Sequence, residues 1–239
     1  MGMALCGFAQ QDASSDLGPV LKHLGTTAQA LQHSLPSFTC QETGVSGWRS
    51  LSKAGDHDDF SATLRAKRNS EGTFSESYEL TRLNGRPFSS HEFTFPYYVS
   101  GGFDRAMRYF LPEQQVCYRY SLSGNRLTFE SVPDSMGHPQ CSDSDLQGMA
   151  TLDANGDIVH MERSVSQRAA RRLNLAPFAA IDFSPVILDG KTFWLSSHMV
   201  SDMLQGNFAM HFDVTYSDCR LFTATVKIGP ATQVSPSGP

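Results

Sequence analysis

Three residues in the last quarter of the chain have the side-chain types of a hydrolytic triad: Ser197, His198 and Asp202. Such a triad needs an imidazole that takes the serine proton and a carboxylate that orients the imidazole. Adjacent strand residues point to opposite faces, however, so Ser197 and His198 are poorly placed for this transfer. The only Gly-x-Ser segment, Gly44–Trp48, lacks the closing glycine of a nucleophile elbow. We therefore predict no catalytic residues and no enzyme activity.

The segments His57–Asp59 and His91–Glu92 place imidazoles beside carboxylates, which are ligand types of metal sites. Neither has the spacing that puts two imidazoles on one helix face, and such pairs are typical of solvated turns. The segment Asp153–Asp157 is similar to a calcium loop, but it lacks the glutamate at the twelfth position and fits a hairpin turn. We predict no metal and no cofactor.

Aromatic residues gather between positions 93 and 110. Packing in the core is the ordinary role of such residues, but a concentration of this kind is also suited to lining an apolar cavity. The candidate ligand-binding residues are Phe93, Phe95, Tyr97, Phe103, Met107 and Phe110.

Arg163, Arg168, Arg171 and Arg172 form the basic cluster of the sequence. A cluster of this kind is suited to anionic lipid head groups or an acidic partner. More often, however, such a cluster is a solvated face.

Four cysteines beyond the N-terminal region, an even number, suit an oxidising compartment. They contain no Cys-x-x-Cys and show no zinc-site spacing. Of the three possible pairings we favour Cys117 with Cys141, bracketing a polar loop, and Cys40 with Cys219, joining the first strand to the last. Buried free thiols are the alternative.

A helix is expected at the N-terminal end, where apolar residues recur with a period near 3.6 residues. The apolar positions are Leu17, Leu21, Leu24, Ala28, Leu31 and Leu35. Residues Ser14–Asp16 can cap this helix, and Pro36 ends it because the residue before a proline is pushed out of the helical region. A second, short helix is expected at Gly101–Phe110.

Apolar and polar residues alternate over most of the remaining chain, as in half-buried strands. Extended chain is expected at 38–51, interrupted by Gly44 and Gly47, and at 60–64, 73–83, 116–122, 126–132, 149–152, 157–165, 179–188, 192–198, 208–216 and 222–228. Asn84–Gly85 and Asp189–Gly190 predict tight hairpin turns because both positions tolerate positive φ.

Strands joined in sequence order by short turns give an up-and-down antiparallel sheet, and a helix with one apolar stripe needs a sheet face to cover it. We predict an α+β fold, mainly antiparallel β, with a strongly curved sheet or incomplete barrel packed on the N-terminal amphipathic helix. Burying the apolar stripe contributes on the order of 10 kcal/mol before chain entropy is counted.

The chain has 239 residues, of which 40% are hydrophobic and 18% charged, and a formal charge of -5. This composition is typical of a globular protein. The net negative charge gives no general attraction to a phosphate backbone, so we predict no nucleic-acid partner. No apolar run approaches the roughly 18 to 20 residues that cross a bilayer, so we predict no membrane-spanning segment. We expect a residual export signal at 1–11, a single domain at 12–229 and a disordered tail at 230–239.

Several short segments resemble a family of uncharacterised secreted bacterial proteins. They are Leu35–Cys40, Asn84–Pro87, Gly148–Glu162, Lys191–Ser197 and Tyr216–Phe222, and together they extend over nearly the whole chain. The architecture of this family is similar to that of periplasmic lipoprotein-localisation carriers. The resemblance implies an incomplete antiparallel barrel, closed by helices around an apolar cavity that holds acyl chains.

Two functions follow as hypotheses, both in the periplasm or outside the cell. The first is an envelope protein that binds a hydrophobic small molecule or lipid in a half-barrel cavity. The second is an interaction module whose core is filled by its own side chains and whose surface recognises another envelope protein.

Overall fold

The computed structural model describes residues 16–50, 53–88, 99, 101–132, 141, 146–166, 169–171 and 174–222. Within these ranges lie the α-helix α1 (Leu17–Ser34) and two short 3-10 helices, η1 (Arg108–Phe110) and η2 (Gln115–Cys117); residues 169–171 are also helical. The strands are β1 (Phe38–Ser50), β2 (Lys53–Arg68), β3 (Phe74–Leu83), β4 (Arg86–Pro87), β5 (Tyr118–Ser123), β6 (Arg126–Ser131), β7 (Leu146–Leu152), β8 (Ile158–Val165), β9 (Leu175–Leu188), β10 (Lys191–Gln205) and β11 (Phe208–Leu221).

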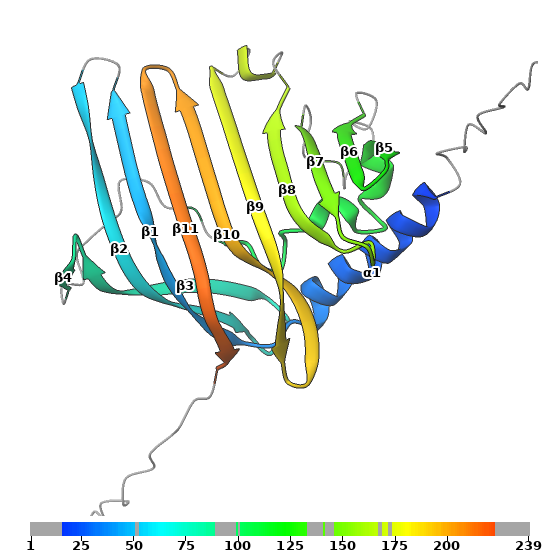
Figure 1. Ribbon diagram of the computed structural model, residues 1–239, viewed down its shortest axis with the longest axis horizontal. Coiled ribbons are helices and arrows are strands. Elements are labelled where there is room, and N and C mark those ends of the chain that lie inside the picture. Colours follow the sequence, from blue (N-terminus) through cyan, green and yellow to red (C-terminus); the bar gives the residue numbers. More distant parts are fainter. Residues whose placement is uncertain are drawn as a thin grey trace, which may run out of the picture.

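All eleven strands form one antiparallel sheet in the order β4-β3-β2-β1-β11-β10-β9-β8-β7-β6-β5 (Figure 1). The predicted class, mainly antiparallel β with an N-terminal helix, is confirmed. The strand order differs from a simple sequence-order meander because β1 pairs with β11 in the middle of the sheet. Since β4 and β5 lie at opposite edges, the chain between them passes from one edge to the other.

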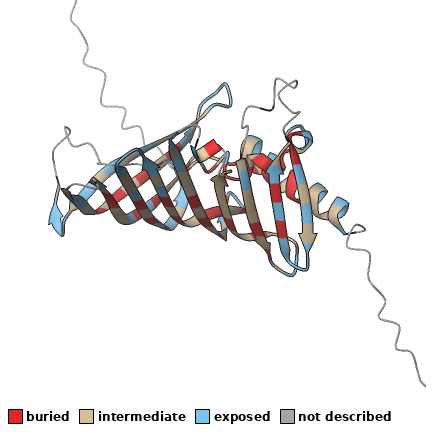
Figure 2. Cartoon of the chain, turned by 90° about the horizontal axis from the view of Figure 1, so that it is seen from above, coloured by how far each residue is buried: buried red, intermediate tan, exposed pale blue. Residues whose placement is uncertain are grey.

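The sheet has an inner face, part of which α1 covers, and an outer face. On β1, β2 and β11 the even-numbered residues point inward, and Phe60, Leu64, Phe212 and Val214 are buried there. The alternation appears as buried bands across the strands in Figure 2. Figure 1 shows α1 running along one side of the sheet, where it contacts β10 and η1. The two-residue period of the strands therefore separates the core from the outer surface.

The helix α1 confirms the predicted apolar stripe: Leu24, Ala28 and Leu31 are buried on its inner side. Arg68 of β2 closes its C-terminal end, where helix carbonyl groups have no partner within the helix. Its Nη2 donates to the Leu31 carbonyl oxygen at 3.3 Å and its Nε to that of Leu35 at 2.9 Å. The helix is thus attached to the sheet at its end as well as along its face.

The second predicted helix, Gly101–Phe110, is wrong. The chain there makes successive turns that end in η1, and Gly102 has a positive φ of 56°. Glu76 of β3 accepts hydrogen bonds from the backbone N–H groups of Gly102 and Phe103 at 3.1 and 2.9 Å. Because this carboxylate binds the start of the segment and two glycines disfavour a regular helix, tight i to i−3 turns form instead.

Several strand boundaries also differ from the prediction. Gly44 and Gly47 do not interrupt β1; a side chain at Gly44 would lie 2.1 Å from the Asp213 carbonyl oxygen, so glycine permits the close approach of β11. The strand β10 extends to Gln205, and η2 occupies the expected start of β5. Residues 1–11, 223–228 and 230–239, where a signal, a further strand and a tail are expected, lie outside the described residues.

The four cysteines form the two favoured pairs, Cys40 with Cys219 and Cys117 with Cys141. The register of β1 against β11 shifts by one residue beside Cys40, and Asp218 takes a positive φ of 51° there. The strand β11 has one extra residue opposite Cys40, which is a β-bulge. Without this extra residue Cys219 would lie on the outer face with Ser217, because side chains alternate along a strand. The bulge therefore turns Cys219 to the side on which Cys40 lies.

Candidate functional site

The described members of the candidate ligand-binding set are core residues. Phe103, Met107 and Phe110 are 1% exposed or less. Phe103 makes edge contacts with Phe38 and Tyr216, with ring centres 5.2 and 5.0 Å apart. These three side chains hold the 101–117 segment against the sheet. Phe93, Phe95 and Tyr97 lie outside the described residues.

A cavity of about 260 Å³ opens on the inner face, between the 99–109 segment and strands β7 to β10. Its apolar lining comprises Val99, Leu146, Val165, Pro177, Phe178 and Met203. A second cavity of about 230 Å³ adjoins it and is lined by Gly101, Gly102, Arg105, Ala106 and Ile181. Arg108 and Arg163 line both, so the two cavities meet at these two arginines.

Strand geometry explains how Arg163 reaches the inner face. On β8 it lies two residues after Met161, which is fully buried, so both side chains point inward. Its partners across the sheet are Gly148 on β7 and Ala179 on β9. Because these neighbours are small, the long side chain has room above the sheet. Arg163 was considered part of a basic cluster; its described neighbour in the cluster, Arg171, is exposed, and Arg168 and Arg172 lie outside the described residues.

Tyr109 fixes the position of the Arg163 guanidinium. Arg163 Nη1 donates to Tyr109 Oη at 2.5 Å, and the guanidinium carbon lies 5.8 Å from the ring centre. The Arg108 guanidinium carbon lies 5.2 Å from the same ring. The ring stacks on Phe129 at 5.4 Å and is 1% exposed. One rigid aromatic ring thus positions two cationic groups.

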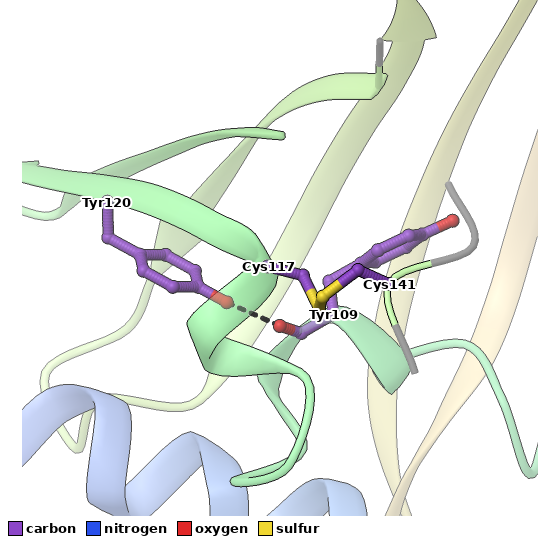
Figure 3. Close-up of a disulfide and its surroundings, with 4 residues drawn as sticks. All are labelled: Tyr109, Cys117, Tyr120 and Cys141. Carbon is purple, nitrogen blue, oxygen red and sulfur yellow. Dashed lines mark hydrogen bonds between the residues drawn. A yellow bond between two sulfur atoms is a disulfide. The ribbon is translucent and has the colours of Figure 1, made fainter. Parts of the chain in front are cut away.

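The Cys117–Cys141 disulfide and Tyr120 secure the backbone next to this tyrosine (Figure 3). Tyr120 Oη donates to the Tyr109 carbonyl oxygen at 2.5 Å, and burial raises the pKa of the Tyr120 phenol well above its ordinary value. The phenol therefore stays protonated as a hydrogen-bond donor.

A row of alternating carboxylates and imidazoles crosses the outer face over β8 to β11. His160 Nδ1 lies 2.6 Å from Asp182 Oδ1, and its Nε2 lies 3.4 Å from Glu162 Oε1. His198 Nδ1 lies 3.1 Å from Asp182 Oδ2, and its Nε2 lies 2.9 Å from Asp213 Oδ1. Because carboxylates only accept hydrogen bonds, each imidazole satisfies both neighbours when both ring nitrogens carry hydrogen. We refer to these five residues as the histidine–carboxylate row.

The row shifts the pKa values of its central members. Burial by itself lowers the pKa of both histidines, but hydrogen bonds and charge attraction from the carboxylates outweigh it and raise the pKa of His160 and of His198. Burial also raises the pKa of Asp182, yet hydrogen bonds from the two histidines lower it overall. The folded state thus favours protonated histidines beside an ionised Asp182.

The row makes stability depend on pH with a definite sign. The raised pKa values of the two histidines stabilise the folded state below about pH 6.5, and this contribution is lost as the pH rises through the pKa values of the folded state. The lowered pKa of Asp182 stabilises the folded state above about pH 4, and this contribution is lost on acidification.

We expect His198→Gln to cost about 1 kcal/mol or less at pH 5.5, because these side chains are partly exposed, and close to nothing at pH 9. Urea unfolding at both pH values measures this; His57→Gln on β2 is the control, and a pH-independent cost would contradict the assignment.

Ser197, His198 and Asp202 do not form the hydrogen-bonded chain of a catalytic triad. Ser197 Oγ donates to the Asp182 carbonyl oxygen at 3.2 Å, and Asp202 Oδ1 lies 2.7 Å from His211 Nδ1. His198 is engaged by Asp182 and Asp213 instead. Among the described residues, no group of three or more His, Cys, Asp or Glu side chains is arranged to hold a metal ion.

The other polar segments serve turns. Asp153 Oδ1 accepts hydrogen bonds from the backbone N–H groups of Asn155 and Asp157 at 2.8 and 2.9 Å, which closes the β7–β8 hairpin. Asp157 also lies 2.8 Å from His23 Nε2 on α1. On β2, Asp58 Oδ1 accepts from Asn84 Nδ2 at 2.8 Å, beside the β3–β4 turn. His91–Glu92 lies outside the described residues.

No family model matches the chain, and no curated protein matches its sequence. Solved structures with a similar arrangement include the following two. A LolA superfamily protein from Nitrosomonas europaea is 9% identical, with 86% of this chain and 94% of that chain covered and a TM-score of 0.36. A putative outer membrane lipoprotein-sorting protein domain from Vibrio parahaemolyticus is 11% identical, with 86% and 93% covered and a TM-score of 0.38.

Sequence reasoning missed two features of the molecule. Arg163 was counted within a basic cluster and was not expected at a cavity. Tyr109 belonged to the aromatic concentration suited to lining a cavity, but it was not among the candidate ligand-binding residues. The sequence did contain a signal, because Arg163 lies two residues after Met161 on a predicted strand and the two side chains therefore share one face. The histidine–carboxylate row was missed because its members are far apart in the sequence and meet only through the register of β8 to β11.

The described helices include none long and apolar enough to cross a bilayer.

Proposed function

We propose that the protein is an exported, non-enzymatic envelope protein that binds a hydrophobic or lipid-like ligand on the inner face of its sheet. The observation that carries this proposal is the open cavity of about 260 Å³ beside the 99–109 segment, with its apolar lining from β7 to β10. Together with the adjoining cavity of about 230 Å³ it lies within the roughly 300 to 1,000 Å³ of small-molecule pockets. An apolar ligand would remove this lining from water, which is the main source of affinity in such sites.

The cysteines support placement in the periplasm or outside the cell. Two disulfides, Cys40–Cys219 and Cys117–Cys141, are formed, and such bonds persist in oxidising compartments. One of them, Cys117–Cys141, lies near Tyr109 (Figure 3), and Tyr109 lines the cavity. An oxidised envelope protein with a preformed apolar cavity is suited to carrying or sensing a lipid-like molecule.

Binding is tested with purified, delipidated protein by native mass spectrometry and titration with a fluorescent fatty acid. We expect saturable binding of one ligand by the native chain. Val165→Trp, which fills the apolar cavity, is expected to weaken binding about tenfold, since losing a buried aliphatic segment costs roughly 1 to 3 kcal/mol.

Val200→Trp is the matched control, because Val200 is a half-buried β10 valine on the outer face, opposite Ala180 and Asp213. It is expected to leave the affinity unchanged. An absence of saturable binding to the native protein rejects the proposed function, and equal effects of the two variants would show that the ligand lies elsewhere.

An interaction module for another envelope protein is the second candidate. The β10–β11 hairpin favours it, because Leu204 and Phe208 near its turn are 46% and 51% exposed. The strand register puts them on opposite faces of the hairpin, so each face of its tip presents one exposed apolar side chain to a partner. Cross-linking from this hairpin in intact cells should give one reproducible adduct that Phe208→Ser removes; without such an adduct this candidate is rejected.

A further inference from the structure

The charge of the cavity lining indicates what kind of ligand fits. Arg105, Arg108 and Arg163 line the adjoining cavities, and the described lining of both contains no carboxylate. Arg105 Nε lies 3.8 Å from Asp104 Oδ2, outside the lining. Arg163 forms no ion pair within the described part of the chain; its polar contact is the hydroxyl of Tyr109. One end of the site is therefore apolar and the other cationic.

Arg163 is held ready for an anion. It is half-buried, and its guanidinium is anchored by the Tyr109 hydroxyl and ring. That contact uses one of five N–H donors in a planar fork, a shape that matches carboxylate and phosphate oxygens. Arg108 lines the same end of the cavity, with its guanidinium carbon 5.2 Å from the centre of the same ring. An anion at this end would meet the remaining N–H donors of Arg163.

The scaffold around the two arginines is rigid. Glu76 binds the backbone N–H groups of Gly102 and Phe103, at the start of the segment that carries Arg108. Gly148 beside Arg163 is kept small by the sheet, since a side chain there would lie 2.3 Å from the Phe129 ring. The cationic end is thus built into the fold, and binding requires little ordering of side chains.

We propose that the ligand is an amphiphile with one anionic head group, a carboxylate or a phosphate, bound at Arg163 beside Arg108, with its apolar tail in the cavity lined by Val165 and Phe178. This inference rests on the proposed function and specifies the ligand class of the same site. The protein thereby selects anionic over neutral lipids of equal chain length.

The test uses four probes on the delipidated protein by isothermal titration calorimetry: dodecanoate, dodecyl phosphate, neutral 1-dodecanol and inorganic phosphate. The anionic amphiphiles should bind at least about tenfold more tightly than dodecanol, the advantage expected of a charge-assisted hydrogen bond. Inorganic phosphate should bind far more weakly than dodecyl phosphate, because it has no tail. Equal binding of the two phosphates would overturn the proposal in favour of a free anion.

Variants of the cationic end complete the test. Arg163→Met should abolish the preference for anionic probes while dodecanol binding is kept. Arg163→Lys keeps the charge but not the planar fork, and Tyr109→Phe removes the positioning hydroxyl. Each should reduce the preference several-fold. Because both changes are conservative, they still test the site if Arg163→Met does not fold. Arg65→Gln, an exposed arginine on β2 paired with Glu79, is the control and should change nothing.

The failures of the two proposals are distinguishable. If no amphiphile binds, the proposed function itself is rejected. If dodecanol binds as tightly as dodecanoate, or if Arg163→Met leaves the preference intact, lipid binding stands and the anionic head group is rejected.

Discussion

Leu24→Asp is expected to unfold the protein. Leu24 is fully buried where α1 meets the sheet, and Gly25 beside it packs closely on Phe110 and Pro112. Truncating such a leucine to alanine costs about 2 to 5 kcal/mol, and an unpaired buried carboxylate costs more. Domains have only about 5 to 15 kcal/mol of stability, so the change removes most or all of it.

The measurement is urea unfolding followed by far-UV circular dichroism, with Leu24→Ala as an intermediate variant and Gln29→Asp as the control. Gln29 lies on the exposed side of the same helix, so its replacement tests the charge without the burial. We expect the loss of stability to increase from Gln29→Asp through Leu24→Ala to Leu24→Asp. A stable Leu24→Asp protein would show that α1 is not required for the sheet to fold.

Removing the Cys40–Cys219 disulfide is expected to give the second-largest loss. The bond joins residues 179 apart in the sequence, and loop-entropy arguments give about 5 kcal/mol for a loop of that length. It also joins β1 to β11, the pair through which the N-terminal and C-terminal parts of the sheet meet. The double variant Cys40→Ala and Cys219→Ala should therefore have a strongly reduced free energy of unfolding.

The matched comparison is the double variant Cys117→Ala and Cys141→Ala. This bond closes a separation of 24 residues, for which the same argument gives about 3.5 kcal/mol. Urea unfolding of both variants, and of the native protein with and without reductant, measures the two losses. A larger loss from the Cys117–Cys141 variant would contradict the loop-length account and point to local packing beside Tyr109.

The histidine–carboxylate row contributes to stability through charges at the surface and not through the core. Its expected effect is small because its side chains remain partly in water. Leu24 and the Cys40–Cys219 bond act through burial and chain connectivity, which pH changes far less. Measuring unfolding at two pH values therefore distinguishes the row from the elements that hold the core together.

The sequence alone was sufficient for α1 and for the buried faces of the strands. The 3.6-residue period of α1 and the two-residue period of the strands are properties of neighbouring side chains, and the core faces of both followed from them. The turns at Asn84–Gly85 and Asp189–Gly190 adopt the positive φ values that those residue types predict. The cysteine pairs were also expected, since few pairings are possible.

Tertiary structure decided the rest. Strand order depends on which distant strands pair, and β1 meets β11 only after the chain passes between the two edges of the sheet. The segment 101–110 has an apolar pattern that fits a helix, but Glu76, from a strand 25 residues earlier, binds its first N–H groups. Arg163 became a cavity residue because Gly148 and Ala179 flank it across the sheet. Local periodicity reports which face a side chain takes, whereas only long-range register decides what it meets there.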